Sequence, residues 1–404
     1  MIKKSCGAVL RIFLVCSVFL LLITQLTYAV SGKEGNTKEE ITGEQKLDLL
    51  ATSAILVDGD NGRVLYEKNG YEERAMASTT KIMTLLVALQ YGNLEDQVEV
   101  SAYAASMPDV QLNIRKGESY YLKDLLYSLM LESHNDTAVA IAEHIGGSVE
   151  GFAELMNQMA YDIGAYHTHF VTPNGLDDDN HYSTAYDLAL IARQAIEIPA
   201  FIEITNTKSY SFTDVAGNRS FTVNNHNAFL NMYSGAIGVK TGFTGNAGYC
   251  FVGAVERDGH KLIAVVLACG WPPHKTYKWK DMKTLFDYGF SNYNLETVYE
   301  PQPQAVAVYI ENGIETNMCY GYTEDSIALY MTQGETVNYV WNVPESIEAP
   351  VRAGETIGSV DIMINGNFYR RVFVRADRTV QPITFQYIFE KIWRIFSCRE
   401  GRGF

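Results

Sequence analysis

The sequence predicts an α+β protein, in which one antiparallel sheet is covered by helices and is followed by a small β-rich domain and an amphipathic C-terminal helix. Strand-like runs occur near residue 54 and again between residues 209 and 268, while helix-like runs fill the chain between them. After Tyr299 the sequence pattern changes to short β-rich runs separated by turns. The simplest assembly joins the strands of both ends into one sheet and packs the helices on it.

The strands of the first region are apolar runs bounded by turn residues. Segments 54–57 and 63–66 flank the turn at 58–62, which favours a hairpin. Further strands are predicted at Ser209–Thr213, 236–240, 249–256 and 261–268.

Between these strands, residues 78 to about 200 contain long stretches without Gly or Pro. Such stretches favour helices. Helices are predicted at 136–144, 152–161, 185–195 and, beyond the last strand, 276–288.

Beyond Tyr299, β-rich runs are predicted at 305–310, 326–330 and 368–374. The pairs Asn312-Gly313, Gln333-Gly334 and Asn365-Gly366 separate them as turns. This pattern is typical of a small all-β domain.

The first 29 residues have the pattern of a secretory signal peptide, with an early basic segment, an apolar run and small residues before Ala29. An uncleaved membrane anchor is the alternative, and both imply export. We expect a signal peptide at 1–29, a linker at 30–48, the first domain at 49–296, the β-rich domain at 297–380 and the terminal helix at 382–398. The formal net charge of −15 argues against nucleic-acid binding.

The terminal segment gathers its apolar side chains within one arc of a helix, with Phe385, Ile388, Phe389, Ile392 and Trp393 among them. The apolar run is too interrupted to span a bilayer. We expect this helix to lie in a membrane interface, and the alternative is a helix docked on the protein's own core.

Two cysteines, Cys6 and Cys16, lie in the leader, and Cys250 and Cys269 flank the predicted turn at Asp258-Gly259. With that turn the last two are diagonal neighbours, about 7–8 Å apart. We predict free thiols, although a turn shifted by one residue would place them opposite each other.

The chemistry of the chain begins at Ser78 and Lys81, which are three residues apart at the start of a predicted helix. Residues at this spacing share a helix face. A serine needs an adjacent base to become a nucleophile. A lysine can be that base only when it is neutral, and at pH 7 only about one ordinary lysine in 2,500 is neutral. Burial and a nearby positive charge lower a lysine pKa, and Lys240 is the natural neighbour.

Two further motifs follow in order, namely Ser133-His134-Asn135 and Lys240-Thr241-Gly242. Each of the three is weak alone, but the ordered set in an exported chain resembles penicillin-binding proteins and class A β-lactamases. The neighbouring segments narrow the match to the serine D-alanyl-D-alanine carboxypeptidases, the low-molecular-mass penicillin-binding proteins of peptidase family S11. The segments that carry this resemblance are 77–84, 133–138, 170–176, 181–185 and 239–244.

This resemblance covers roughly residues 49–290 and implies a β-lactamase-like domain with a five-stranded antiparallel sheet and a helical subdomain. It implies that Ser78 is the nucleophile, Lys81 the general base and Ser133 a proton relay, although the acylation base of this class is disputed. Lys240 would supply positive charge and bind the substrate carboxylate. The substrate-binding residues would be Asn135, Lys240, Thr241, Gly242, Phe243 and Thr244, with the backbone N–H groups of Ser78 and Phe243 as the oxyanion donors.

One residue departs from the family pattern, which often has Gly where His134 stands, and this side chain could narrow or line the site. His167 and His169 share one face of a strand or loop, but no Cys, Asp or Glu at ligand spacing supports a metal site. We expect no metal and no cofactor.

The function that follows is removal of the terminal D-Ala from peptidoglycan stem pentapeptides, with β-lactams as covalent inhibitors and the membrane surface as a further partner. The closest alternative is a D,D-endopeptidase of the same family. A β-lactamase would need Glu-x-x-x-Asn between the second and third motifs, and neither Glu143, Glu150, Glu154, Glu197 nor Glu203 has Asn four residues on. A non-catalytic cell-wall-binding protein is the least favoured, because all the chemical groups are present.

Overall fold

A computed structural model describes residues 47–108, 110–314 and 316–397 of the chain. The predicted signal peptide, nearly all of the predicted linker, and Cys6, Cys16 and Cys398 lie outside the described residues. Those predictions therefore stay predictions.

The first region contains a five-stranded sheet in which every neighbouring pair is antiparallel, as predicted. Strands from both ends of the region meet at its centre, where Leu56 pairs with Ala264. The order across the sheet is β2 (Val64–Lys68), β1 (Ser53–Asp58), β9 (His260–Leu267), β8 (Gly248–Arg257) and β7 (Ala236–Thr244).

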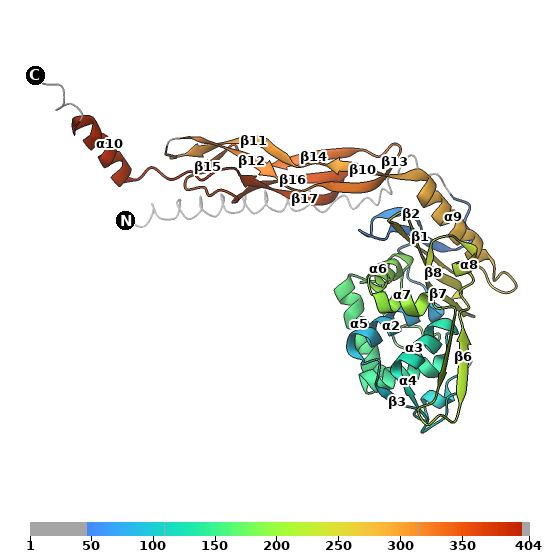
Figure 1. Cartoon of the computed structure of the whole chain (residues 1–404). Helices are drawn as coiled ribbons and strands as arrows, with labels where there is room; N and C mark the ends of the chain where they lie inside the picture. Colours follow the sequence, from blue (N-terminus) through green and yellow to red (C-terminus); the bar gives the residue numbers. More distant parts are fainter. Residues whose placement is uncertain (1–46, 109, 315, 398–404) are drawn as a thin grey trace, which may run out of the picture. The chain divides into compact units, whose positions relative to one another are not determined.

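Six helices cover one face of this sheet, and they lie together on one side of it in Figure 1. They bury a core in which Ile55, Val252 and Val265 of the sheet meet Leu85 and Ile191 of the helices. The helices are α2 (Lys81–Tyr91), α3 (Leu122–Leu131), α4 (Asn135–Gly146), α5 (Val149–Ile163), α6 (Ala185–Ile196) and α7 (Pro199–Asn206).

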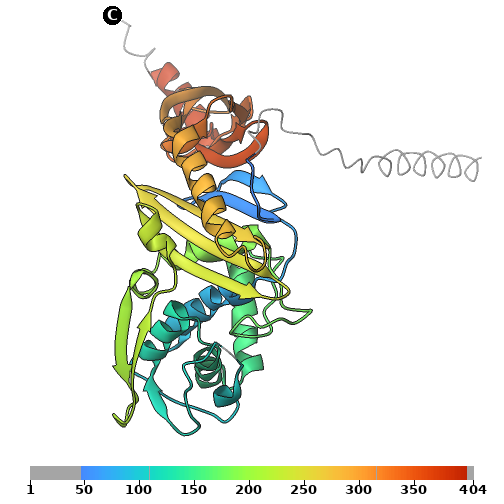
Figure 2. The same ribbon diagram turned by 90° about the vertical axis from the view of Figure 1, so that its right-hand side faces the viewer.

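The other face is covered by α8 (Phe229–Met232) and α9 (Tyr277–Asn292), and Figure 2 shows α9 lying across the sheet. Phe251 and Leu262 of the strands pack there with Phe286 of α9. Because both faces are covered, the three inner strands β1, β9 and β8 are largely apolar instead of alternating with polar residues.

Two short hairpins complete this region. One pairs β3 (Gln97–Glu99) with β4 (Ser119–Tyr121), and the other pairs β5 (Ser209–Thr213) with β6 (Ser220–Asn224). The chain also forms two 3₁₀ turns. The first, η1 (Ala77–Thr80), directly precedes α2, and the second, η2 (Ala104–Ser106), precedes the loop that leads to β4.

Cys250 and Cys269 are buried free thiols, as predicted, but for a different reason. Cys269 donates its backbone N–H to Tyr249, and Ala268 before it has a left-handed φ of 48°. This irregular residue puts Cys269 into the core under α9, whereas Cys250 belongs to the core on the opposite face. The two thiols therefore lie on opposite faces of the sheet and are not diagonal neighbours on one face.

The β-rich region begins as α9 runs into β10 (Tyr293–Tyr299), which pairs with β13 (Ile327–Thr332). A separate sheet has the order β14 (Val337–Asn342), β16 (Thr356–Ile364), β17 (Asn367–Ala376), β12 (Met318–Thr323), β11 (Gln302–Glu311) and β15 (Ser346–Glu348). Val360, Ile362 and Val372 form part of its core. The domain limits stay predictions.

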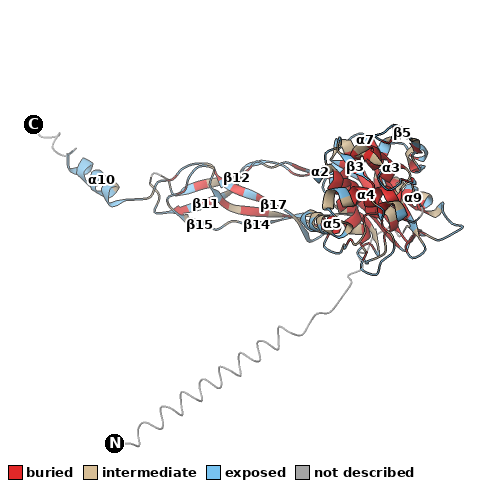
Figure 3. Cartoon of the chain, turned by 90° about the horizontal axis from the view of Figure 1, so that it is seen from below, coloured by how far each residue is buried: buried red, intermediate tan, exposed pale blue. Residues whose placement is uncertain are grey.

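The last helix, α10 (Phe385–Ser397), has no buried residue, and Figure 3 shows it coloured mostly as exposed. Its apolar side chains are exposed as well, with Phe385 at 84% and Trp393 at 66%. Within the described residues, no helix has both the length and the apolar character needed to cross a membrane.

Candidate active site

The Ser78 turn is wedged between two glycines. Ser78 is half-buried in η1, directly before Lys81 begins α2, so the two residues are one turn apart. A Cβ on Gly242 of β7 would lie 2.9 Å from the Ser78 backbone nitrogen, and one on Gly175 would lie 2.1 Å from the Ala77 carbonyl oxygen. Glycine at these two positions therefore lets β7 and the 170–176 loop approach the turn.

The Lys81 amine contacts three oxygens. Its Nζ lies 2.9 Å from Ser78 Oγ, 2.9 Å from Asn135 Oδ1 and 2.6 Å from the Asn174 carbonyl oxygen. Two of these oxygens are carbonyls, which can only accept hydrogen bonds. A neutral amine has two N–H bonds and one lone pair. In the structure, Nζ donates to Ser78 Oγ, and the Ser78 hydroxyl donates to the Asn174 carbonyl at 3.4 Å. Once the amine is neutral and its two N–H bonds point at Asn135 and Asn174, its lone pair is the group that can accept the Ser78 proton.

Electrostatics favour that neutral form. The side chain of Lys81 is fully buried. Burial and, next, the positive charge of Lys240 hold the pKa of Lys81 well below its ordinary value, against the opposite pull of Asp136. Lysine becomes a usable base near neutral pH when its pKa is lowered in this way.

Lys240 is also buried, in β7, and donates from Nζ to the Thr241 carbonyl oxygen at 2.8 Å. Burial lowers the pKa of Lys240 to about 7. An anion that bound beside it would favour its charged form. The site can therefore gain positive charge when a carboxylate arrives.

The second motif forms the turn into α4. Ser133 is half-buried and has a left-handed φ of 69°, while Asn135 is the first residue of the helix. In the part of the chain that the structure describes, no hydrogen bond joins Ser133 Oγ to Lys81. Asn135 contacts Lys81 directly, whereas the relay by Ser133 stays a prediction.

Thr244 already has partners. Its hydroxyl donates to Asp177 Oδ1 at 2.6 Å and accepts from the Ala247 backbone N–H at 3.0 Å. Phe243 is 42% exposed and its ring contacts Tyr249. Direct binding of a carboxylate by Thr244 would therefore require its hydroxyl to leave Asp177, whereas Lys240 and Thr241 need no such exchange.

Two groups that bear on Lys81 were missed from the sequence. The Asn174 carbonyl contacts its amine, and His181 supports the loop that carries Asn174. His181 Nδ1 accepts from the backbone N–H groups of Val171 and Thr172, so Nε2 carries the proton and donates to Thr80 Oγ1 at 2.7 Å. Burial lowers the pKa of His181 to about 4, so this link is neutral at pH 7.

The expectation that the His134 side chain narrows or lines the site is wrong. His134 is 4% exposed, its Nδ1 lies 2.8 Å from Ser128 Oγ of α3, and its Nε2 lies 3.3 Å from Glu132. Glu132 in turn accepts the backbone N–H of Asn224. The imidazole therefore points into the helical core and ties the turn to α3 and β6.

No group of three or more His, Cys, Asp or Glu side chains that could hold a metal ion occurs among the described residues. The groups gathered around Ser78 are a hydroxyl, the buried amine of Lys81, the amide of Asn135 and the second amine of Lys240. That set of groups is suited to acyl transfer.

Comparison with known proteins agrees with this chemistry. A family model described as D-alanyl-D-alanine carboxypeptidase matches residues 39–270. The chain is 31% identical to the D-alanyl-D-alanine carboxypeptidase DacF of Bacillus subtilis, over 91% of this chain and 95% of that protein. It is 34% identical to a D-alanyl-D-alanine carboxypeptidase of Streptomyces sp. strain K15, over 67% of this chain and 97% of that protein.

Among solved structures, penicillin-binding protein 5 from Haemophilus influenzae matches with a TM-score of 0.69 at 27% identity, over 84% of this chain and 100% of that chain. The D-alanyl-D-alanine carboxypeptidase structure from Mycobacterium tuberculosis matches with a TM-score of 0.58 at 34% identity. It covers 62% of this chain, and 95% of the Mycobacterium chain is matched.

Proposed function

The chain belongs to the D-alanyl-D-alanine carboxypeptidase family of S11 serine peptidases, and from that premise we propose that it removes the terminal D-Ala from peptidoglycan stem pentapeptides through an acyl-enzyme on Ser78. The observation that carries the proposal is the geometry at Lys81. Its amine is buried and lies within hydrogen-bond distance of two carbonyl oxygens and, at 2.9 Å, of Ser78 Oγ. In the neutral form the two carbonyls take its N–H bonds, and the lone pair can then accept the Ser78 proton.

In the proposed acylation, Ser78 Oγ attacks the carbonyl carbon between the two D-Ala residues while Lys81 takes its proton. The oxyanion that forms is stabilised by the backbone N–H groups of Ser78 and Phe243. Fixed donors of this kind contribute roughly 3–4 kcal/mol each to lowering the barrier. The Gly242 contact supports this assignment, because it brings the backbone of β7 against the Ser78 nitrogen.

Collapse of the intermediate breaks the C–N bond and expels D-Ala, whose nitrogen takes up a proton through Ser133. Water then attacks the ester with Lys81 as the base and restores the hydroxyl of Ser78. A β-lactam acylates Ser78 by the same first step, but its leaving nitrogen stays tethered to the acyl group. The tethered fragment remains in the site and hinders water, so the ester lasts much longer than the one formed with a peptide.

Recognition of the terminal carboxylate is assigned to Lys240 and Thr241, with Thr244 and Gly242 beside them. Lys240 is the group best placed for this role, because it is buried in β7 and a bound carboxylate would favour its charged form, which burial alone disfavours. Asn135 binds the backbone of the substrate peptide, in addition to its contact with Lys81. A requirement for a free carboxylate is what separates a carboxypeptidase from an endopeptidase.

The test is release of D-Ala from an acyl-Lys-D-Ala-D-Ala tripeptide, run beside covalent labelling by a fluorescent penicillin. Ser78→Ala is expected to abolish both, because Ser78 carries the hydroxyl that lies 2.9 Å from the Lys81 amine. Continued labelling of Ser78→Ala at one fixed serine would contradict the proposal. A chromogenic cephalosporin in parallel tests for a β-lactamase, and a crosslinked peptide without a free terminal carboxylate tests for an endopeptidase.

We also propose that the enzyme works in the cell envelope, at the outer face of the cytoplasmic membrane, and that α10 lies in the membrane interface. The support is the exposed apolar face of α10, on which Phe389 is 58% exposed and Trp393 66% exposed. An apolar face with Trp and Phe and basic residues beside it is suited to the headgroup region.

Deleting residues 383–404 should abolish sedimentation of the protein with vesicles that contain anionic lipid, while release of D-Ala continues at the same rate. Replacing Phe389 and Trp393 together by serine should weaken binding in the same direction. Undiminished sedimentation of the truncated protein would refute the role of α10.

A further inference from the structure

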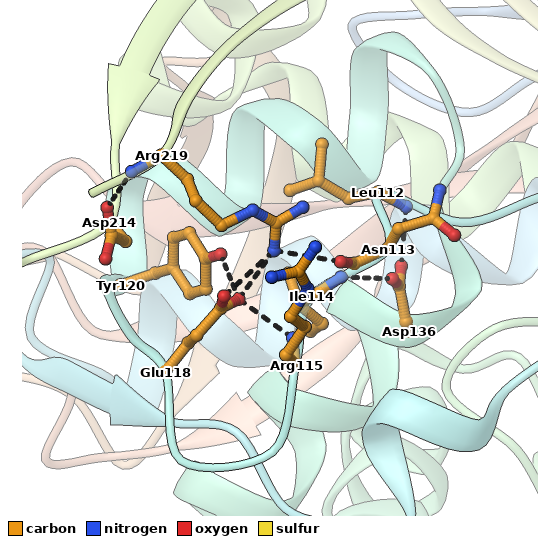
Figure 4. Close-up of polar contacts among 9 residues, drawn as sticks. All are labelled: Leu112, Asn113, Ile114, Arg115, Glu118, Tyr120, Asp136, Asp214 and Arg219. Carbon is orange, nitrogen blue, oxygen red and sulfur yellow. Dashed lines mark hydrogen bonds and ion pairs between the residues drawn. The ribbon is translucent and has the colours of Figure 1, made fainter. Parts of the chain in front are cut away.

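A carboxylate at the start of α4 holds the loop beside the active site. Asp136 is 1% exposed and accepts the backbone N–H groups of Leu112 at 3.0 Å and Ile114 at 3.2 Å, besides that of Thr137 (Figure 4). Asp136 directly follows Asn135 of the catalytic motif. The position of loop residues 110–118 is therefore tied to the residue next to Asn135.

Asn135 itself contacts Val110 of this loop and Pro108, which precedes the loop in sequence. The backbone N–H of Asn135 donates to the Val110 carbonyl at 2.7 Å, and its side-chain Nδ2 donates to the Pro108 carbonyl at 3.2 Å. The other side-chain atom, Oδ1, accepts from Lys81. Because an amide group is planar, fixing Nδ2 also fixes the direction of Oδ1 toward the catalytic amine.

The far end of this loop is held by Arg219, which lies between β5 and β6. Its Nη1 donates to the Asn113 carbonyl at 3.0 Å and to Glu118 at 2.7 Å (Figure 4). Glu118 also accepts the Tyr120 hydroxyl at 2.7 Å and the Arg115 backbone N–H at 2.8 Å. The Arg219 and Glu118 side chains are only 22% and 17% exposed, so water screens this ion pair less than a surface pair.

We infer that Arg219 is a positioning residue for acylation, acting through Asn113 and Glu118 on the loop that orients the Asn135 amide toward Lys81. The inference rests on the proposed function of Ser78 and Lys81. Arg219 contacts neither of them. Instead, it fixes the position of the loop, the loop fixes the orientation of the Asn135 amide, and Asn135 accepts one of the two N–H bonds of the neutral Lys81 amine. Small misplacements of catalytic groups can cost about 10²-fold in rate.

Replacing Arg219 should leave the hairpin folded. The backbone N–H of Arg219 donates to Asp214 at 2.6 Å, and the Val215 backbone N–H donates to the Ser119 carbonyl at 2.9 Å. These two hydrogen bonds do not involve the guanidinium group. Arg219→Ala therefore removes the side-chain tie and keeps the backbone connection between the hairpin and β4.

The experiment compares Arg219→Ala and Arg219→Lys with the wild-type protein and with Arg371→Ala. The Arg371–Asp361 pair of the β-rich region is also a close arginine–carboxylate pair, but it lies outside the catalytic region. Each protein is first titrated with fluorescent penicillin to count competent sites. The second-order acylation rate is then measured per competent site across a pH series, together with the melting temperature.

We expect Arg219→Ala to acylate about 10- to 100-fold more slowly per competent site, with Arg219→Lys intermediate and Arg371→Ala unchanged. The acidic limb of the pH profile should move to higher pH in Arg219→Ala. Loosening the loop removes N–H donors from Asp136 and admits water, and both changes favour the charged form of Lys81, on which Lys240 acts in the opposite direction.

An unchanged rate and pH profile in Arg219→Ala, with or without a lower melting temperature, would overturn the inference. If Arg219→Ala yields no folded protein, Arg219→Lys decides, and a rate equal to that of the wild type overturns it. Wild-type protein that neither binds penicillin nor releases D-Ala would instead refute the proposed function, so the two failures are distinguishable.

Discussion

The catalytic region and the β-rich region treat polar side chains in opposite ways. The first buries Lys81, Lys240, Asp136 and His181 in or beside its site. The described residues between 302 and 376 bury only Thr323 and Ser359 among polar side chains. Buried charge is costly unless other groups stabilise it. Some of this buried charge, such as Asp281 in α9, is structural, but Lys81 and Lys240 are buried at the site itself, where burial favours a neutral amine.

Charge pairs show the same contrast. In the β-rich region Arg371 pairs with Asp361 while half of its side chain stays exposed. In the catalytic region Arg219 pairs with Glu118 and also binds the carbonyl of Asn113 in the loop that contacts Asn135. Both are close arginine–carboxylate pairs, but only the second is connected to groups that contact the catalytic lysine.

The largest expected effect comes from Lys81→Met, which removes the amine and keeps an unbranched side chain. Acylation by penicillin should fall by roughly 10²- to 10⁴-fold, the usual contribution of a general base. The melting temperature should stay the same or rise, because a buried amine is replaced by an apolar group. Stopped-flow acylation and thermal melting measure the two effects, and Arg371→Met is the matched control. Acylation near the wild-type rate would break the contrast between the regions.

The second prediction concerns stability against pH. Burial lowers the pKa of Lys240 to about 7 in the folded protein, below the ordinary value of 10.5 that applies when the chain is unfolded. Between these values the unfolded state binds more protons, so the free energy of unfolding should rise as the pH rises from about 7 toward 10.5. Each pKa unit of difference corresponds to about 1.4 kcal/mol.

Urea unfolding at pH 7 and pH 9.5 tests this, with Lys240→Met as the comparison in which all other titrating groups are kept. Wild-type stability should increase relative to the variant between the two pH values. Equal pH dependence in both proteins would mean that Lys240 is not buried as an amine with a lowered pKa.

The motifs allowed prediction of the reacting side chains but not of the groups that hold them. Ser78, Lys81, Asn135 and Lys240 carry distinctive chemistry at recognisable spacing. The Asn174 carbonyl does not, because every residue has a carbonyl and only the fold decides which one reaches Lys81. The hydrogen bond between His181 and Thr80 likewise joins residues that are 101 positions apart in sequence, so only the fold brings them together.

Strand existence and type were predicted well in the sheet, where apolar runs are long and both faces are buried. Local irregularities were not. Cys269 moved to the opposite face because Ala268 adopts a left-handed conformation that no alternation of residue types reveals. The sequence left open that the His134 side chain narrows or lines the site, because the family often has Gly there, yet Ser128 and Glu132 give its ring polar partners away from the site.

The smallest expected effect on activity comes from a cavity in the β-rich region, and it tests the proposed domain division most directly. Ile362 is fully buried in a core of that region, so Ile362→Ala should cost about 2–5 kcal/mol of local stability. If residues 297–380 fold as a domain of their own, calorimetry should show one transition shifted down and another unchanged, with acylation per competent site at the wild-type rate. A single transition that moves as a whole would show that the two regions unfold together. In that case the absence of buried charge from the β-rich region would reflect its lack of catalytic groups and not a separate folding unit.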